Sequence, residues 1–214
     1  MAHLTFPSRN RRNFLQLGLA SGVVALAASP LSAQENEMPA ALRQALEREQ
    51  LGAVLGNPAG DITLTEFFDY NCPYCRSMVA DLHQVIADDP GLRVVLREWP
   101  VFGAGSLYCA RASLASLRQG RFRQFHTALL AIKGQADDKS AMRVAAQVGL
   151  DITRLRADME DVALARQIEH SWILAEQMGL VGTPSLIVGN LGGVGKQTAG
   201  EMRRMIQEAR RSGT

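Results

Sequence analysis

Two cysteines separated by a Pro-Tyr pair lie between a predicted strand and a predicted helix, and this junction constrains the fold more than any other stretch. The apolar run 62–68 is typical of a buried strand, and residues 77–87 have the amphipathic spacing of a helix. Cys72 and Cys75 stand between the two. Pro73 suits a first helical turn, because its φ is already helical and no N–H is needed from it there. The sequence therefore predicts a strand, a turn and a helix, with both sulfurs at the helix start.

A helix start favours the anionic form of a cysteine. The unpaired backbone N–H groups and the helix dipole stabilise negative charge there, so we expect the pKa of Cys72 to lie below the free value of about 8.5. The i, i+3 spacing places Cys75 on the same helix face, within reach of a short disulfide. The spacing thus favours a dithiol that opens and closes reversibly.

A zinc site and a static disulfide are the two other interpretations of this pair. Structural zinc usually takes four ligands, often as two close pairs, whereas the only other cysteine, Cys109, stands alone and no two histidines have ligand spacing. A static bridge more often closes a long loop. We therefore expect no metal, a buried apolar role for Cys109, and surface or packing roles for His126 and His170.

The first 33 residues have the composition of an export signal. Three arginines and no acidic residue accompany an apolar stretch, 17–28, that is short for a membrane span. The pair Arg11-Arg12 resembles a twin-arginine signal, with an ordinary secretory signal as the alternative. Removing those three arginines from the 23 basic residues leaves 20 against 21 acidic ones, so the remaining body is near neutral and suggests no nucleic-acid surface.

Helical patterns dominate the rest of the chain. Residues 35–50 predict a helix that packs on the domain, with a small oligomerisation element as the alternative. Residues 52–60 break that pattern with glycines and a turn. A second apolar strand, 91–101, completes a right-handed strand–helix–strand unit, and residues 106–179 are almost entirely helical.

Glu66 lies inside the first predicted strand, and the sequence leaves its environment open. A buried carboxylate beside the cysteines would have a raised pKa and would relay protons to Cys75. The alternative is a carboxylate that faces water on an alternating strand.

Thr183 and Pro184 precede a short apolar strand, 186–188, and their peptide bond is either cis or an ordinary trans bond. A cis bond would turn the Thr183 backbone toward a neighbouring site and leave its polar groups free to pair with an extended peptide. The glycine-rich residues 189–196 predict a hairpin turn, and residues 199–211 a closing helix.

The run Phe67-Phe68-Asp69-Tyr70-Asn71-Cys72-Pro73-Tyr74-Cys75, followed some hundred residues later by Gly182-Thr183-Pro184, resembles the DsbA branch of the thioredoxin superfamily. The resemblance implies an α/β fold, a thioredoxin fold with an inserted helical domain. We expect an N-terminal helical segment over 34–56, a thioredoxin-fold domain over 57–104 and 180–214, and an inserted helical domain over 105–179.

The resemblance also implies roles for the site residues. Cys72 would be the attacking, solvent-facing thiol and Cys75 the buried resolving one. The loop of Thr183 and Pro184 would be a cis-Pro loop packed over the cysteines, and Glu66 would match the family's buried acid.

The Pro73-Tyr74 pair departs from the Pro-His of the best-known oxidases. It resembles the pair in the isomerase relative DsbG and in glutaredoxins. A histidine at this position helps to lower the thiol pKa, which Tyr74 cannot do by charge.

The function implied is a periplasmic thiol–disulfide oxidoreductase that exchanges its disulfide with cysteines of exported proteins, as an oxidant and without a cofactor. Expected partners are unfolded or misoxidised exported proteins and a membrane redox partner, and not nucleic acid. One alternative is an isomerase or reductase that is kept reduced and acts as an oligomer. Another is a copper-handling protein, since soft thiolates select Cu(I). The oligomeric state stays open.

Overall fold

The computed structural model describes residues 2–3, 37–48 and 52–213. The predicted export signal lies outside these residues, apart from Ala2 and His3, as do both ends of the helix expected over 35–50. No helix within the described ranges is both long and apolar enough to cross a membrane.

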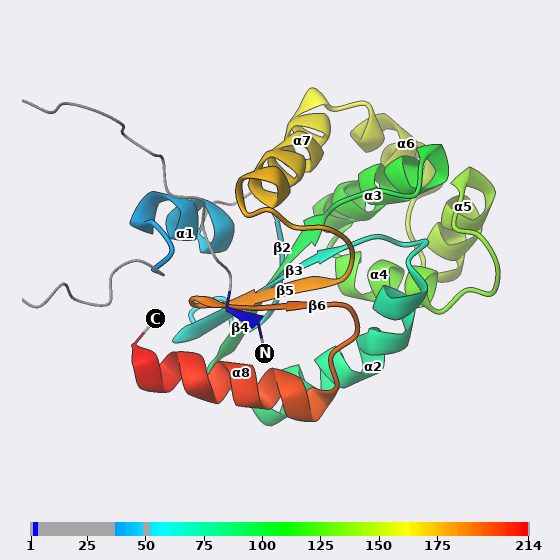
Figure 1. The fold of residues 1–214 in the computed structure, drawn as a ribbon. Helices are drawn as coiled ribbons and strands as arrows, with labels where there is room; N and C mark the ends of the chain where they lie inside the picture. Colours follow the sequence, from blue (N-terminus) through cyan, green and yellow to red (C-terminus); the bar gives the residue numbers. More distant parts are fainter. Residues whose placement is uncertain (1, 4–36, 49–51, 214) are drawn as a thin grey trace, which may run out of the picture.

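A mixed sheet forms the centre of the described structure (Figure 1), with the strand order β1-β6-β5-β3-β4-β2. Only β3 and β4 pair in parallel; the other neighbours are antiparallel. The helix α2 (Pro73–Asp88) connects the parallel pair, which confirms the predicted strand–helix–strand unit. The strands are β1 (Ala2–His3), β2 (Ala53–Gly56), β3 (Ile62–Phe68), β4 (Leu92–Glu98), β5 (Ser185–Val188) and β6 (Leu191–Val194).

The strand β2 corrects the boundary expected for the N-terminal segment. Residues 53–56 were expected to follow a helix as a break and a turn, but they pair antiparallel with β4 at the sheet edge. Gly52 precedes this strand and Gly56 ends it, so too few side chains remain to show the alternation of a strand in the sequence. Gly56 has φ +72°, and a Cβ there would lie 2.5 Å from the carbonyl oxygen of Leu92. The glycine is therefore needed where the chain leaves β2.

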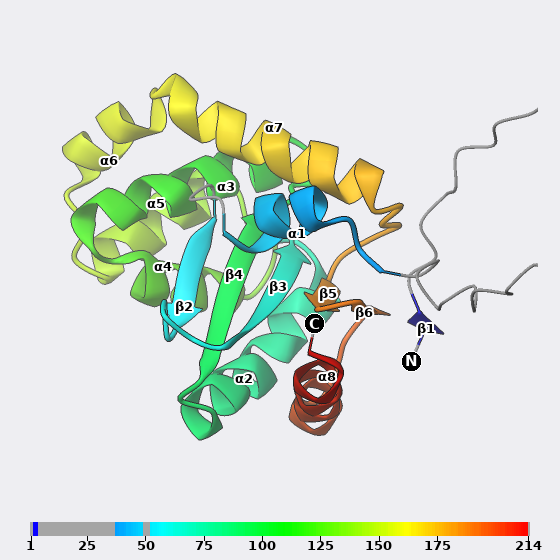
Figure 2. The ribbon, with the colours of Figure 1, turned by 90° about the vertical axis from the view of Figure 1, so that its left-hand side faces the viewer.

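Helices cover both faces of the sheet. In Figure 2, α1 (Ala40–Glu47) and α7 (Val162–Gln177) lie above it, and α2 and α8 (Ala199–Ser212) lie below. Because both faces are covered, all seven residues of β3 are buried. The helix α1 packs on its own domain, as expected: Leu46 is fully buried, and Arg97 of β4 donates a hydrogen bond of 2.8 Å to its carbonyl oxygen.

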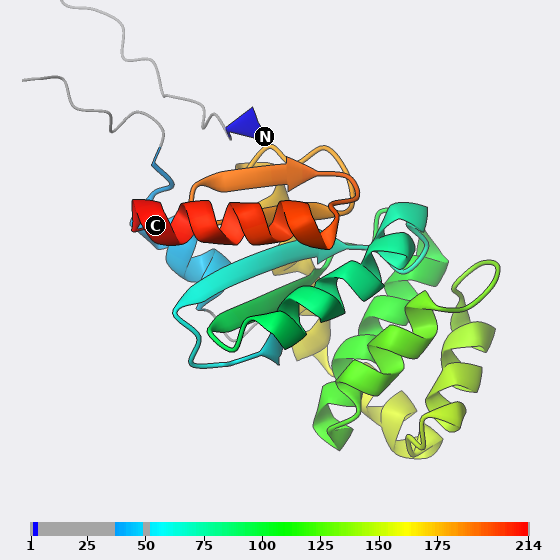
Figure 3. The same cartoon turned by 90° about the horizontal axis from the view of Figure 1, so that it is seen from below.

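The inserted helices follow β4 and gather beside one end of the sheet (Figure 3). They begin with α3 and end with α7, after which the chain returns to the sheet as β5. Asp137 caps α5 in a reciprocal pair with Ser140. The inserted elements before α7 are α3 (Ala104–Ser116), the short 3-10 helix η1 (Leu117–Gln119), α4 (Phe122–Leu130), α5 (Asp138–Gln147) and α6 (Ile152–Met159).

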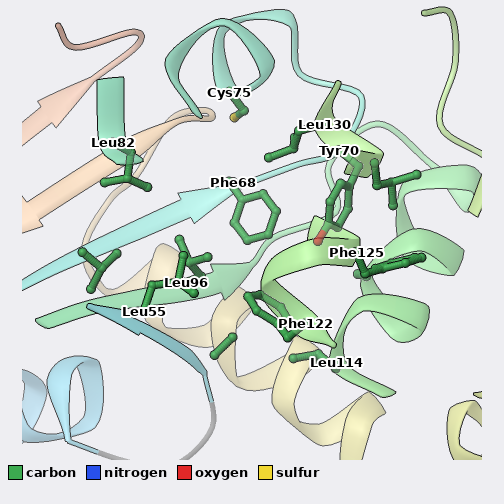
Figure 4. Packing of buried hydrophobic residues seen from close by; sticks show 14 of the residues in the cluster. Leu55, Phe68, Tyr70, Cys75, Leu82, Leu96, Leu114, Phe122, Phe125 and Leu130 are labelled. Carbon is green, nitrogen blue, oxygen red and sulfur yellow. The ribbon is translucent and has the colours of Figure 1, made fainter. Parts of the chain in front are cut away.

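Two apolar clusters fill the interior, one on each side of β3. Phe68 joins the larger cluster, which continues into the inserted helices through Phe122 and Phe125 (Figure 4). Phe67 joins the smaller one, under α1 and α7. Since side chains alternate along a strand, Glu66 lies on the same face as Phe68, toward α2.

Candidate dithiol site

The two cysteines lie where the sequence predicted them, at the start of α2. Cys72 has extended backbone angles and directly precedes the helix, Pro73 is its first residue, and Cys75 lies in the first turn. The Cys72 N–H donates a hydrogen bond of 3.1 Å to the Asp69 carbonyl oxygen, which closes the turn after β3. Both cysteines are free thiols in this structure.

Their surroundings shift the two thiols in opposite directions. A hydrogen bond from Cys75 lowers the pKa of Cys72 to about 6, with further lowering from backbone N–H groups of the first helical turn and opposition from burial. Burial raises the pKa of Cys75, and the hydrogen bond to Cys72 and the charge of Glu66 add to this. At neutral pH Cys72 is therefore anionic while Cys75 keeps its proton.

Glu66 lies on the buried side of β3, which decides the alternative that the sequence left open. Its residue surface is 4 % exposed. Burial raises its pKa to about 8, and the nearby Cys72 adds to the shift. The side chain therefore carries a proton at neutral pH close to both sulfurs.

The peptide bond between Thr183 and Pro184 is cis. Antiparallel pairing of β5 with β3 brings this loop beside Cys72, although 111 residues separate them in the chain. The Cys72 sulfur lies 3.1 Å from the Thr183 carbonyl oxygen, to which it donates a hydrogen bond when it is protonated. The hydroxyl of Ser185 donates to the Gly182 carbonyl oxygen at 2.6 Å and closes the turn.

A cavity of about 390 Å³ opens beside Cys72 and has apolar walls. Tyr74, Phe102 and Val181 stand at its rim with 61 %, 52 % and 86 % of their surfaces exposed. The lining residues are Cys72, Pro73, Tyr74, Trp99, Val101, Phe102 and residues 180–183.

The expectation of a solvent-facing Cys72 needs correction. Only 1 % of its surface is exposed, as for Cys75, because the Thr183 carbonyl packs against its sulfur. The two cysteines differ instead in access, since Cys72 lines the cavity and Cys75 does not.

Several residues of the site were missed at the level of sequence. Trp99, Val101 and Phe102 form a cavity wall, although the sequence indicated only the end of a strand there. The Asp69 carboxylate accepts hydrogen bonds from the N–H groups of Asn71 and of Phe102, a residue of this wall. Their residue types were the available signal, because Asp and Asn near a helix start commonly bind backbone N–H groups.

Tyr70 is the centre of a second buried polar group. Its hydroxyl lies 2.5 Å from the Ser113 hydroxyl and 2.9 Å from Nδ1 of His126. Burial lowers the pKa of His126 to about 3, so the ring is neutral. His126 is thus a packing residue, as predicted, but it lies in the interior.

Cys109 is fully buried, and burial raises its pKa to about 12, so it is an unreactive thiol as expected. Within the described part of the chain, no three His, Cys, Asp or Glu side chains are arranged to hold a metal ion. The Cu(I) alternative for the cysteine pair stays a prediction.

Comparisons with known proteins support this fold. The family model of the DSBA-like thioredoxin domain matches residues 63–207. The crystal structure of a thioredoxin-like oxidoreductase from Silicibacter pomeroyi DSS-3 is 41 % identical, covers 79 % of this chain and 98 % of its own, and superposes with a TM-score of 0.77. The thiol-disulfide exchange protein alpha-DsbA2 from Wolbachia pipientis is 27 % identical, covering 78 % and 91 %, with a TM-score of 0.73.

Curated relatives extend the comparison. The thiol:disulfide interchange protein DsbA of Bordetella pertussis is 31 % identical over 140 residues, which are 61 % of this chain and 64 % of the relative. The Na(+)/H(+) antiporter NhaA 3 of Salinispora tropica is 28 % identical over 137 residues, 63 % of this chain. The chain spans only 21 % of that antiporter's length, so the similarity concerns one part of it.

Proposed function

The chain belongs to the family of DSBA-like thioredoxin domains, and on this premise we propose that it is a periplasmic thiol–disulfide oxidoreductase that oxidises cysteines of exported proteins. The observation that carries the proposal is the opposed pKa shifts of Cys72 and Cys75. A low thiol pKa makes Cys72 a good leaving group and stabilises the reduced protein, which makes its disulfide a stronger oxidant. Each pKa unit corresponds to about 1.4 kcal/mol.

Exchange begins when a substrate thiolate attacks the Cys72 sulfur of the Cys72–Cys75 disulfide. A bond forms between the substrate sulfur and Cys72 as the bond to Cys75 breaks, and Cys75 leaves as a thiolate that takes up a proton. A second substrate thiolate attacks the substrate sulfur of this mixed disulfide and releases Cys72 as a thiolate. The substrate loses two electrons and gains a disulfide, and the protein becomes the dithiol. A membrane redox partner is expected to reoxidise it.

We assign Glu66 the role of proton donor to Cys75. The expelled Cys75 thiolate is strongly basic, because burial raises its pKa. Glu66 acts on it electrostatically and, with a pKa of about 8, holds a proton at neutral pH. Proton transfer from Glu66 would neutralise Cys75 as it leaves.

The cavity supports an unfolded polypeptide as substrate. Its apolar walls fit the side chains that an unfolded chain exposes beside a cysteine. In the disulfide form, as in the thiolate form, Cys72 has no S–H to donate, so the Thr183 carbonyl oxygen is available to a peptide N–H.

Export supports the oxidising direction. The basic and apolar segments within the first 33 residues favour a periplasmic location, with the twin-arginine route indicated by Arg11-Arg12. In an oxidising compartment a Cys-x-x-Cys pair can be maintained as a disulfide.

Refolding of a reduced and of a scrambled disulfide protein by the purified protein tests the proposal. We expect the oxidised protein to restore the reduced substrate with matched loss of its own disulfide, and Cys72→Ser to abolish this. Cys75→Ala cannot form the disulfide, but its Cys72 thiolate can attack a disulfide of the scrambled substrate, and this mixed disulfide should accumulate because no Cys75 thiol resolves it. Activity on the scrambled substrate alone would instead identify an isomerase, and no activity on either would refute thiol–disulfide exchange.

A further inference from the structure

A buried hydrogen-bond network centred on Asp69 joins three separate segments next to Cys72. Asp69 is 1 % exposed. Its Oδ1 accepts hydrogen bonds from the Asn71 N–H and the Ser106 hydroxyl, both at 2.7 Å. Its Oδ2 accepts from the Phe102 N–H at 3.0 Å. We call Asp69, Asn71, Ser106 and their partners on Phe102 and Ala136 the Asp69 network.

Asn71 extends the Asp69 network to the loop between α4 and α5. Its Oδ1 accepts from the Ala136 N–H at 2.7 Å, and its Nδ2 donates to the Ala136 carbonyl oxygen and to the Ser106 hydroxyl, each at 2.9 Å. A Cβ on Gly105 would lie 2.7 Å from the same Ala136 oxygen, so these segments already touch. The amide is thus held at both ends and has one allowed orientation.

One residue of this network holds both the reactive turn and a cavity wall. The Asp69 carbonyl oxygen accepts the Cys72 N–H, and the Asp69 carboxylate accepts the Phe102 N–H. Phe102 and its neighbour Val101 line the cavity into which Cys72 opens. The separation between the sulfur and this wall therefore depends on the geometry of Asp69.

We propose that Asp69 and Asn71 are positioning residues that set the Val101–Phe102 wall against Cys72, so that a peptide with an apolar residue beside its cysteine delivers that sulfur to Cys72. The inference rests on the proposed function, because it assumes that peptide cysteines react there. Holding two reactants in a fixed geometry lowers the barrier only for a substrate that touches the wall. A small thiol such as dithiothreitol reaches the sulfur without that contact.

Reduction of the oxidised full-length protein by two reagents tests this: a peptide with Leu next to its single Cys, and dithiothreitol. In Asn71→Ala we expect the KM for the peptide to rise by about tenfold, while the rate with dithiothreitol changes by less than about twofold. Asp69→Asn should act in the same direction, because it replaces one acceptor oxygen with an NH₂ group. The pKa of Cys72, followed by thiolate absorbance, should stay at the wild-type value in Asn71→Ala.

Asn57→Ala is the matched control. The Asn57 side chain also joins two backbone segments, accepting from the Ala59 N–H and donating to the Pro90 carbonyl oxygen, both at 2.9 Å. It lies at the other end of β3, outside the cavity. We expect it to leave the peptide KM unchanged.

A double variant distinguishes positioning of the Val101–Phe102 wall from a general loss of structure around Cys72. If Asn71 acts through the wall, Asn71→Ala should add little to the peptide KM once Phe102→Ala has removed the contact. Additive effects, or an equal loss with peptide and dithiothreitol, would overturn the inference.

If Asn71→Ala does not fold, Ser106→Ala, which removes only the Ser106 hydroxyl from the Asp69 network, takes its place. A wild-type protein that reacts with neither reagent would refute the proposed function, whereas normal wild-type reactivity with an unchanged variant KM would refute the positioning role alone.

Discussion

At the scale of single residues, two cysteines only three positions apart have very different acidities. Cys72 and Cys75 belong to one helical turn, yet their pKa values move apart because hydrogen bonds outweigh burial at Cys72, whereas burial outweighs the opposing hydrogen bond at Cys75. Tyr74 between them is 61 % exposed. The asymmetry therefore comes from backbone N–H groups, including that of Tyr74, and from the Cys75 thiol, and not from the Tyr74 side chain.

Cys75→Ala tests the largest cause of the Cys72 shift. Removing the hydrogen bond should raise the pKa of Cys72 from about 6 toward that of a free cysteine. Alkylation of the reduced protein by iodoacetamide would then rise with pH between 7 and 9, where the wild-type rate is already flat. Cys109→Ala is the control and should titrate like the wild type. A wild-type rate that still climbs above pH 8 would contradict the assignment.

Glu66→Gln tests the buried acid through stability. The folded protein keeps Glu66 protonated up to about pH 8, whereas the unfolded chain releases that proton near the ordinary value of 4.5. Wild-type stability is thus lost between these values as pH rises, by at most about 1.4 kcal/mol per pH unit. The variant should escape this loss, so its advantage in urea unfolding should grow from pH 5 to pH 8. A constant difference across that window would show that Glu66 does not titrate there.

At the scale of elements, the sequence predicted the structures that depend on neighbouring residues and missed those that depend on distant ones. The strand–turn–helix unit around Cys72 was predicted because a proline and an apolar run leave few other structures for that stretch. The buried side of Glu66 was not, since alternation does not say which face is covered. The wall at Phe102 was missed because only the pairing of distant segments creates it. The strand β2 was missed because its partner, β4, lies some forty residues further on.

Gly56→Ala tests the turn that ends β2. An alanine there must adopt φ near +72° and must also approach the Leu92 carbonyl oxygen to 2.5 Å. Gly149 has φ +76° but no atom within 4 Å of an added Cβ, so Gly149→Ala carries the backbone cost alone. We expect Gly149→Ala to lower the free energy of unfolding by about 1 kcal/mol and Gly56→Ala by about 1–3 kcal/mol more. Equal losses would mean that β2 moves freely away from Leu92.

At the scale of the whole molecule, oxidation state and stability are linked. A four-residue disulfide loop constrains the unfolded chain little, whereas the thiolate of reduced Cys72 is stabilised only in the folded protein. This stabilisation is present in full above the pKa of the unfolded thiol and is lost as pH falls through about 6.

The reduced protein should therefore melt at a higher temperature than the oxidised protein at pH 7.5. The gap should narrow as pH falls to 5, because Cys72 becomes protonated in both folded and unfolded forms. Thermal unfolding with and without dithiothreitol measures it, and Cys72→Ser should show no response. A disulfide form that is the more stable at pH 7.5 would argue against an oxidant.

The inserted helices leave the sheet after Glu98 and return to it before Ser185, and both crossings border the cavity. Val101 and Phe102 stand at the first crossing, and Leu180 and Val181 at the second. Lengthening or shortening the helices between them would reshape the cavity without disturbing the pairing of β3 with β5 beneath the sulfurs. On the proposed function, thiol chemistry and substrate choice therefore reside in separate parts of this architecture, so evolution can alter one and keep the other.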